Sequence, residues 1–359
     1  MKQVVRLGPI AVANPPHRLS TARSLEVARA LAPDDVSTPV LARLHDRSGI
    51  EHRNCAILGA DGGVPLYGVG PEGGEDEPRV PGTAARMIAY EEHARRLAVE
   101  ATAAAIEADG GGPDRITHLV TASCTGFDAP GVDRSIIEAV GLPANVRRTH
   151  VGFMGCHAAV NALAVARAFA AEDPRHRVLV VCVEISSVHF HRDQRLDRLI
   201  SNTLFADGAA ATVVALGDTG PEVATTAATI IPDTIDVMGW RIGDHGFEMT
   251  LGAEVPEHLR ANLPTWIERT LASHDLSIDA IGGWAIHPGG PRVIDAVVES
   301  LDLPEDAGAT SRSVLREHGN MSSVTLLFIL DRLARAAVPR PWVGLAFGPG
   351  LAGEFLLIR

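Results

Sequence analysis

Apolar residues follow two spacings along this chain, and each spacing predicts a different kind of element. Apolar positions three and four residues apart predict helices over residues 20–31, 39–47 and 83–109, and Thr83 is placed to cap the last of these. Gly, Pro and Glu dominate residues 60–81 and predict a surface loop. Further along, short apolar runs alternate with helical stretches, which is typical of an α/β protein.

The order of these later elements occurs twice. In the first half, it runs through a strand at 116–122, Gly-Cys at the start of a helix at 158–171, a strand at 178–183, Phe-Ala-Asp-Gly, and a strand at 210–216. In the second half, it runs through a strand at 284–286, Gly-Asn at the start of a helix at 322–336, a strand at 343–346, Phe-Gly-Pro-Gly, and a strand at 354–358. The match predicts a duplicated unit with halves at 1–217 and 218–359, although a periodic α/β sequence can produce such a match by chance.

The two repeated helices, 158–171 and 322–336, are apolar on nearly all faces. Helices of this kind are buried in a core rather than lying on a surface. Two buried helices between two sheets predict a five-layered αβαβα sandwich.

Composition excludes several classes of partner. Of the 359 residues, 46% are hydrophobic, which is ample for a large core. The net charge of -12 disfavours nucleic acid and anionic membranes, so an anionic substrate needs a local basic patch. No apolar run reaches the roughly 18 residues that a membrane span needs, and residues 1–18 lack a secretory signal.

The cysteines indicate a reducing compartment. Cys55, Cys124, Cys156 and Cys182 are scattered, without a CxxC pair, which argues against a disulfide framework and against a zinc site. A cytoplasmic enzyme with reduced thiols is the simplest interpretation, and Cys55 and Cys182 are interpreted as core residues.

Three residues at matching points of the two halves carry candidate chemistry. Cys156 follows Gly155 at a helix start, where the helix dipole lowers the pKa of a thiol. His287 ends a predicted strand before Pro-Gly-Gly-Pro, and Asn320 opens the second buried helix. Taken singly, each signal is weak. Cys156 alone is better interpreted as an inert buried thiol, and the alternatives for His287 and Asn320 are a turn histidine and an N-cap. Together, a nucleophile, a base and an amide donor predict a condensing site.

The surrounding motifs make a family resemblance specific. Gly-Phe-Met-Gly-Cys-His-Ala-Ala around Cys156, His-Pro-Gly-Gly-Pro from His287, Gly-Asn-Met-Ser-Ser around Asn320 and Phe-Gly-Pro-Gly-Leu from Phe347 resemble the signature blocks of chalcone-synthase-like (type III) polyketide synthases. The likeness runs from about residue 20 to the C-terminus. It implies the thiolase fold, a homodimer, acyl-CoA and malonyl-CoA as substrates, and no metal or redox cofactor.

The resemblance also implies roles for the three residues. Cys156 would take the acyl starter from coenzyme A, and His287 would keep Cys156 ionised. His287 and Asn320 would stabilise the enolate that forms when malonyl-CoA loses CO2, and that enolate would attack the thioester. Extension would repeat before ring closure.

Five further residues match cavity positions of that family. Phe205 matches a gatekeeper phenylalanine, whereas Met249 stands where a second phenylalanine is usual. Trp240 stands where Gly is common, Cys124 where plant relatives carry Thr, and His189 where Thr or a small residue is usual. A small core residue and a satisfied histidine are the alternatives for Cys124 and His189. His157, beside the nucleophile, is expected to pack rather than to act as an acid or base.

An arginine pair resembles the family's coenzyme A phosphate site. Arg43 and Arg47 are four residues apart and share one face of a predicted helix. Phosphate binding is predicted for these two residues but not for the nearby Arg53, and a solvated helix face is the alternative.

Two other functions are compatible with a thiolase fold. A β-ketoacyl synthase III makes a single condensation, and a catalytically silent binding protein makes none. The motifs His-Pro-Gly-Gly and Phe-Gly-Pro-Gly favour the polyketide branch. Met-Gly-Trp-Arg from Met238 and Cys-Thr-Gly-Phe from Cys124 resemble bacterial resorcinol and pyrone producers, which predicts an aliphatic starter.

Overall fold

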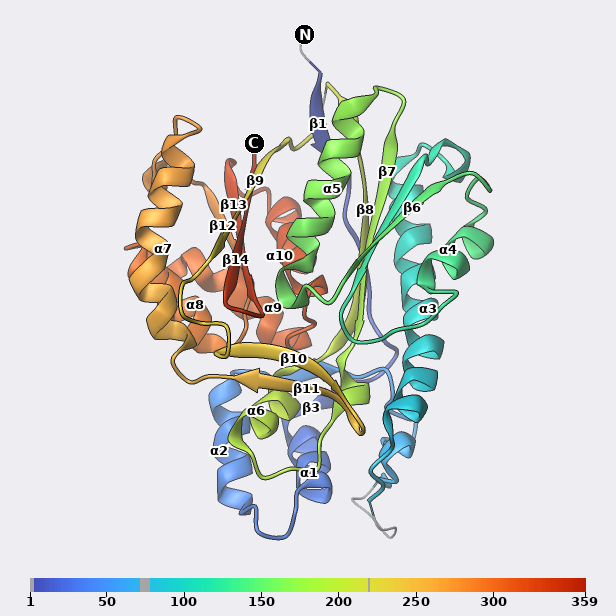
Figure 1. Cartoon of the computed structure of the whole chain (residues 1–359), viewed down its shortest axis with the longest axis vertical. Coiled ribbons are helices and arrows are strands. Elements are labelled where there is room, and N and C mark those ends of the chain that lie inside the picture. Colours follow the sequence, from blue (N-terminus) through green and yellow to red (C-terminus); the bar gives the residue numbers. More distant parts are fainter. Residues whose placement is uncertain (1–2, 72–77, 219) are drawn as a thin grey trace.

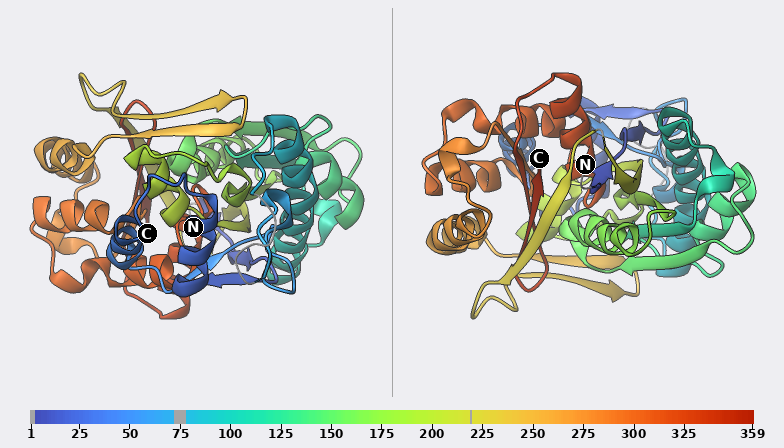
Figure 2. Two further views of the ribbon diagram at one scale, coloured as in Figure 1. Left: turned by 90° about the horizontal axis from the view of Figure 1, so that it is seen from below. Right: turned by 90° about the horizontal axis from the view of Figure 1, so that it is seen from above.

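The chain folds into two sheets with helices between them and on both outer faces. The computed structural model describes residues 3–71, 78–218 and 220–359. Figure 1 shows the layers side by side, and Figure 2 shows them end-on with the same order. The predicted α/β class and the five-layered sandwich are confirmed.

The first sheet has six strands in the order β1-β8-β7-β5-β6, with β2 also paired to β8. Strand β5 is parallel to β7, and β7 is antiparallel to β8. Its strands are β1 (Val4–Leu7), β2 (Ala11–Ala13), β5 (His118–Ser123), β6 (Arg147–Gly152), β7 (Arg177–Ile185) and β8 (Asp207–Gly217).

The second sheet repeats this pairing with fewer strands, in the order β12-β13-β14-β9. Strand β12 is parallel to β13, and β13 is antiparallel to β14, as in the first sheet. The repeat found in the sequence is therefore a repeat of strand pairing. The strands are β9 (Val223–Ile230), β12 (Gly283–Ile286), β13 (Trp342–Gly348) and β14 (Ala352–Ile358).

Helices α5 (Ala158–Glu172) and α10 (Val324–Arg335) fill the space between the sheets. Strand β7 shows how a continuous apolar run serves two cores, because successive side chains point to opposite faces. Val178, Val180 and Cys182 pack against the central helices, whereas the intervening valines and leucine pack on the outer layer. Cys182 is thus a core residue.

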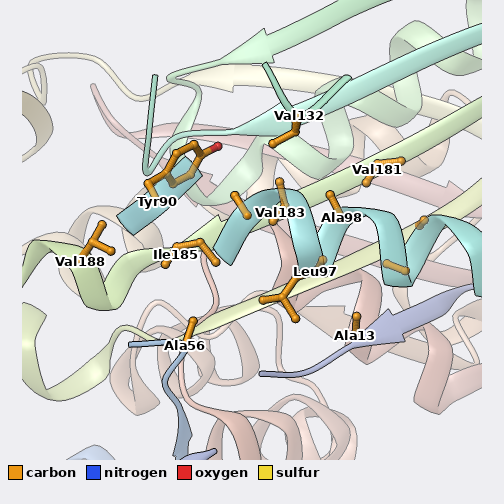
Figure 3. Packing of buried hydrophobic residues seen from close by; sticks show 14 of the residues in the cluster. Ala13, Ala56, Tyr90, Leu97, Ala98, Val132, Val181, Val183, Ile185 and Val188 are labelled. Atoms are coloured by element: carbon orange, nitrogen blue, oxygen red, sulfur yellow. The ribbon is translucent and has the colours of Figure 1, made fainter. Parts of the chain in front are cut away.

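The outer layers are amphipathic helices. Helices α3 (Thr83–Asp109) and α4 (Val132–Val140) cover the first sheet, and Figure 3 shows Leu97 and Ala98 of α3 near Val181 and Val183. Helices α7 (Val255–Ala272) and α8 (Pro291–Ser300) cover the second sheet.

A group of smaller elements lies below both sheets in Figure 1. The hairpin of β10 (Met238–Gly243) and β11 (Gly246–Leu251) crosses beneath them from the second half toward the first. The others are α1 (Thr21–Leu31), α2 (Thr38–Ser48), β3 (Arg18–Ser20), β4 (His52–Asn54) and α6 (Leu196–Leu204). Elsewhere lie α9 (Ala309–His318) and the 3-10 turns Pro65–Tyr67, Pro113–Arg115, Gly155–His157, Ser186–His189, Ile278–Ala280 and Glu305–Gly308.

Two local expectations need correction or limits. Thr83 does not cap α3, since Gly82 occupies the N-cap position and makes no side-chain bond. The Thr83 hydroxyl instead donates to the carbonyl of Gly243 and accepts from the N–H of Gly246 (2.9 Å), which ties α3 to the hairpin turn. The predicted loop at 60–81 falls partly outside the described residues.

Among the helices that the structure describes, none combines the length and the apolar character needed to cross a bilayer. The boundary predicted between residues 217 and 218 stays a prediction.

Candidate active site

Cys156 lies in the 3-10 turn that leads into α5. Gly155 has φ 70°, and a Cβ there would lie 2.6 Å from Cδ of Pro349, so only glycine fits. Pro349 follows β13, and this contact therefore brings the end of the second sheet against the nucleophile candidate. Cys156 is 9% exposed and lines a cavity.

The structure buries His287 and Asn320 with free hydrogen-bonding groups. The backbone N–H of His287 donates to Leu345 (2.7 Å), but neither ring nitrogen has a partner among the described residues. Asn320 accepts through Oδ1 from the N–H of Ser322 (2.9 Å), whereas its Nδ2 is also unpartnered within that part of the chain. Buried polar groups without partners are rare, because each costs free energy. Free groups of this kind suit a ligand that completes their hydrogen bonds.

Backbone hydrogen bonds place Asn320 beside Phe205. The N–H of Asn320 donates to Leu204 (2.9 Å), and the N–H of Ala206 donates to Asn320 (2.8 Å). The loop after α9 in the second half is thereby joined to the loop after α6 in the first half. The pairing of the halves, rather than either half alone, builds the site.

Desolvation dominates the charge states at this site. Burial raises the pKa of the Cys156 thiol to about 12, although the nearby polar side chains of Ser322 and Asn320 oppose the rise. Burial, with a smaller effect of His157, lowers the pKa of His287 to about 3. The expectation that the helix start lowers the pKa of Cys156 is therefore outweighed by burial in the free protein. Both shifts favour a neutral thiol and a neutral imidazole in the free protein.

Four of the five predicted cavity residues line the cavity. Trp240 and Met249 face each other directly across the hairpin, and the indole N–H of Trp240 donates to the carbonyl of Cys124 (2.7 Å). Cys124, Phe205, Trp240 and Met249 all line the cavity together with Cys156. The ring centres of Phe205 and Trp240 are 6.4 Å apart.

His189 lies outside the lining and one layer behind Trp240. Its ring stacks on Phe247 at 4.4 Å and meets the edge of Trp240 at 5.6 Å. A direct contact with substrate stays a prediction. His157 is buried, and its Nδ1–H donates to Asn161 (2.7 Å), which in turn donates to Glu354.

Sequence reasoning missed Glu184, which binds Cys124 and Thr125, the two consecutive residues that form the floor of the cavity. This fully buried carboxylate accepts from the N–H of Cys124 (3.0 Å), the hydroxyl of Thr125 (2.8 Å) and the hydroxyl of Ser323 (2.6 Å). Burial raises its pKa, and these bonds oppose the rise. A glutamate inside the otherwise apolar run of β7 was the signal in the sequence.

Ser322 belongs to the Gly-Asn-Met-Ser-Ser motif, whose sequence alone does not indicate a role for it. Its backbone has φ 49°, unusual for a residue other than glycine, and its hydroxyl lies 3.2 Å from Sγ of Cys124. Ser322 also opposes the rise in the pKa of Cys156, so its hydroxyl acts on both thiols of the cavity.

The three arginines differ sharply. Arg43 and Arg47 are exposed on α2, which packs against α6, and neither forms an ion pair with another described residue. Arg53 is buried, donates to the carbonyls of Asn202 and Phe205 and lies 5.0 Å from the ring centre of Phe190. It is therefore committed to structure, in line with its exclusion from the predicted phosphate site.

No group of three or more His, Cys, Asp or Glu side chains within the described residues is arranged to hold a metal ion.

The fold and the cavity define the class of the protein, an acyl-transferring synthase on the thiolase fold. A polyketide synthase, PKS-I, from the brown alga Ectocarpus siliculosus superposes with a TM-score of 0.91 at 28% identity, over 100% of this chain and 99% of that one. The N-terminal domain of chalcone and stilbene synthases matches residues 77–218, and their C-terminal domain matches residues 222–359. The chain belongs to this family, the type III polyketide synthases.

Two relatives show the range of the family. The chain is 34% identical to a 1,3,6,8-tetrahydroxynaphthalene synthase of Streptomyces peucetius subsp. caesius, over 98% of this chain and 92% of that protein. It is 31% identical to the alpha-pyrone synthesis polyketide synthase-like Pks18 of Mycobacterium tuberculosis, over 88% of this chain and 81% of that protein.

Proposed function

We propose that this enzyme condenses an acyl-CoA starter with malonyl-CoA by decarboxylative Claisen condensation at Cys156. The observation that carries the proposal is the set of unpartnered nitrogens on the buried side chains of His287 and Asn320. Asn320 adjoins the cavity that Cys156 lines, because its backbone pairs with Phe205 of the lining. Preorganised donors in a desolvated site stabilise a developing oxyanion far better than water does.

The reaction has a loading step followed by a condensation step. His287 accepts the thiol proton, Cys156 attacks the thioester carbon, and coenzyme A leaves with that proton. Malonyl-CoA then loses CO2, and its enolate oxygen is stabilised by N–H groups of His287 and Asn320. The enolate carbon attacks the acyl carbon, the bond to the Cys156 sulfur breaks, and a β-ketoacyl-CoA forms.

The substrates would be held as coenzyme A thioesters by Arg43 and Arg47. Guanidinium groups bind phosphate oxygens in a fork, and these two have no competing ion pair in the described structure. With a net charge of -12, the protein needs such a local patch to hold an anionic substrate.

The cavity favours a compact aliphatic starter and a small cyclic product of the resorcinol or pyrone type. Trp240 occupies space that a smaller residue would leave open, and Met249 is the more adaptable member of the pair. One similar protein is named for tetrahydroxynaphthalene and another for alpha-pyrone synthesis, so small ring products are within the family's range.

We also propose a homodimer in the cytoplasm, with coenzyme A thioesters as the only small molecules required. Strand β6 pairs only with β5 in the described structure, and Phe127 and Phe153 are exposed at 67% and 45%. An open sheet edge beside exposed aromatic rings suits a second copy of the chain.

A panel of acyl-CoA starters with malonyl-CoA, without carrier protein, tests the function. Mass spectrometry should show acyl mass on Cys156, followed by products extended more than once and cyclised. A single extension, or dependence on acyl carrier protein, would indicate a β-ketoacyl synthase III activity instead. A protein that gains no acyl mass from any thioester would contradict the proposal.

A further inference from the structure

The hairpin that carries Trp240 and Met249 has little support of its own. In the described structure β10 and β11 pair only with each other and join neither large sheet. An isolated two-stranded hairpin is marginally stable at best. The position of this cavity wall therefore depends on side chains that bind the hairpin from outside.

His189 binds the hairpin from the first half of the chain. Its Nδ1 accepts from the backbone N–H of Phe247 (2.9 Å), and its Nε2–H donates to the carbonyl of Thr125 (2.6 Å). Because one nitrogen must accept and the other donates, these bonds define a single neutral tautomer. Burial lowers the pKa of His189 to about 3, so this tautomer persists across the neutral range.

His191 completes the hold on the same residue. Its Nε2–H donates to the carbonyl of Phe247 (2.8 Å), while Asn202 of α6 binds both backbone groups of His191 (3.0 and 2.7 Å). Both polar backbone groups of Phe247 are thus bound by histidines where a further strand would otherwise pair. Phe247 lies two residues from Met249.

The contacts converge on two consecutive carbonyls at the cavity floor. The Trp240 indole binds the carbonyl of Cys124, and His189 binds the carbonyl of Thr125. The His189 ring also touches both Phe247 and Trp240. One buried side chain therefore connects the backbone beside Cys124 to both strands of the hairpin.

We propose that His189, assisted by His191, is a positioning residue that sets the distance between the hairpin wall and the floor of the cavity, and thereby the starter range and product length. It acts through Trp240 and Met249 rather than by touching the substrate. The proposal rests on the proposed function, since the growing chain must occupy this cavity.

Two conservative variants separate the two bonds of His189. His189→Asn places an amide oxygen near the Nδ1 position and can still accept from Phe247, whereas His189→Gln reaches Thr125 but leaves Phe247 unbound. His189→Phe keeps the ring stack and loses both bonds. His118→Phe is the matched control, because His118 is also a buried histidine stacked on a phenylalanine (4.7 Å), at the opposite end of β5.

The readout is the ratio of products and of accepted starters, with kcat and KM for each starter and acyl loading at Cys156. His189→Phe and His189→Gln should shift the product ratio by about tenfold or more, since a displacement of roughly 1 Å can change a reaction rate by up to about 100-fold. His189→Asn keeps the bond to Phe247 and loses the bond to Thr125, so its product ratio should lie between those of the parent and of His189→Phe. His118→Phe should keep the parent ratio even where its melting temperature falls by a similar amount.

If folded His189→Phe and His189→Gln enzymes give the parent's starters and products, His189 is ordinary packing and the proposal is overturned. The same holds if His118→Phe alters the ratio equally. Should His189→Phe not fold, the comparison of the Asn and Gln variants decides. A parent enzyme that fails to load Cys156 would contradict the proposed function itself, which is a separate outcome.

Discussion

At the scale of single residues, Cys156 and Asn320 share one buried environment but are assigned to different steps. Cys156 would carry the acyl group, whereas Asn320 offers an unpartnered N–H to the enolate of the decarboxylation step. Removing one or the other should therefore damage different reactions.

Cys156→Ala should abolish acyl-enzyme formation while retaining some decarboxylation of malonyl-CoA. Asn320→Ala should slow CO2 release by about 100-fold or more, because it removes one oxyanion donor. Mass spectrometry of the intact protein and a CO2-release assay measure the two steps. Cys182→Ala, a buried thiol away from the cavity, is the control and should still load. Normal CO2 release by Asn320→Ala would contradict the role of Asn320.

At the scale of elements, the hairpin and the α9–α10 pair show how local pieces are held by distant partners. Trp240 is anchored to Cys124, and Glu317 of α9 accepts two bonds from the guanidinium of Arg332 in α10 (3.0 and 2.5 Å). The contact of Trp240 leads to a prediction about product size, and the ion pair of Glu317 leads to a prediction about stability.

Trp240→Gly should admit bulkier starters or give longer products, because the indole fills part of the cavity wall. Loading of a short acyl group on Cys156 should change little. Emptying a fully buried indole typically costs about 3–5 kcal/mol, and Trp240 is half-buried, so a smaller loss of stability is expected. Melting temperature is measured beside the product profile. Trp240→Phe keeps most of the volume and is the matched variant. A folded glycine variant with the parent's starters and products would mean that the cavity is bounded elsewhere.

Glu317→Gln should remove an acid-sensitive part of the stability. Hydrogen bonding to Arg332 lowers the pKa of Glu317 to about 2 in the folded protein, below its ordinary value of 4.5. A depressed pKa stabilises the fold above the unfolded pKa, and this contribution is lost as the pH falls from 4.5 toward 2.

Urea unfolding at a series of pH values measures the effect. The difference between the parent and Glu317→Gln should narrow as the pH falls through that window. Arg332→Gln should show the same pH dependence of its free energy of unfolding. The double variant should be at least as stable as the less stable of the two single variants, because both changes remove the same ion pair. A difference that stays constant with pH would show that the ion pair does not couple to stability.

At the scale of the whole molecule, charge distribution governs how an acidic protein meets an anionic substrate. The net charge of -12 repels coenzyme A thioesters in general, and Arg43 and Arg47 offer an exposed exception on α2.

Replacing both Arg43 and Arg47 by Ala should raise the KM for malonyl-CoA roughly tenfold and weaken its dependence on salt. Steady-state kinetics at two or more salt concentrations measure both effects. The control is Arg115→Ala with Arg147→Ala, which removes two exposed charges near the far end of β5. An unchanged KM would contradict phosphate binding and would mean that Arg43 and Arg47 only form a solvated helix face.

Much of the architecture could be predicted from the sequence, because strands and helices produce short-range patterns of apolar residues. The two-residue and 3.6-residue periodicities predicted the strands and helices of both halves, and their repeated order predicted the matching sheets. The motifs around Cys156, His287 and Asn320 predicted the family for the same reason, since each block is contiguous.

Only the tertiary structure decided what depends on burial and on partners far apart in sequence. Thr83 binds a hairpin more than 150 residues away. His189 lies behind Trp240 rather than in the lining, and the thiol of Cys156 is desolvated enough to outweigh the helix start. No local pattern specifies such contacts, because the pleat and the helical turn set which way a side chain points, whereas packing sets what it meets.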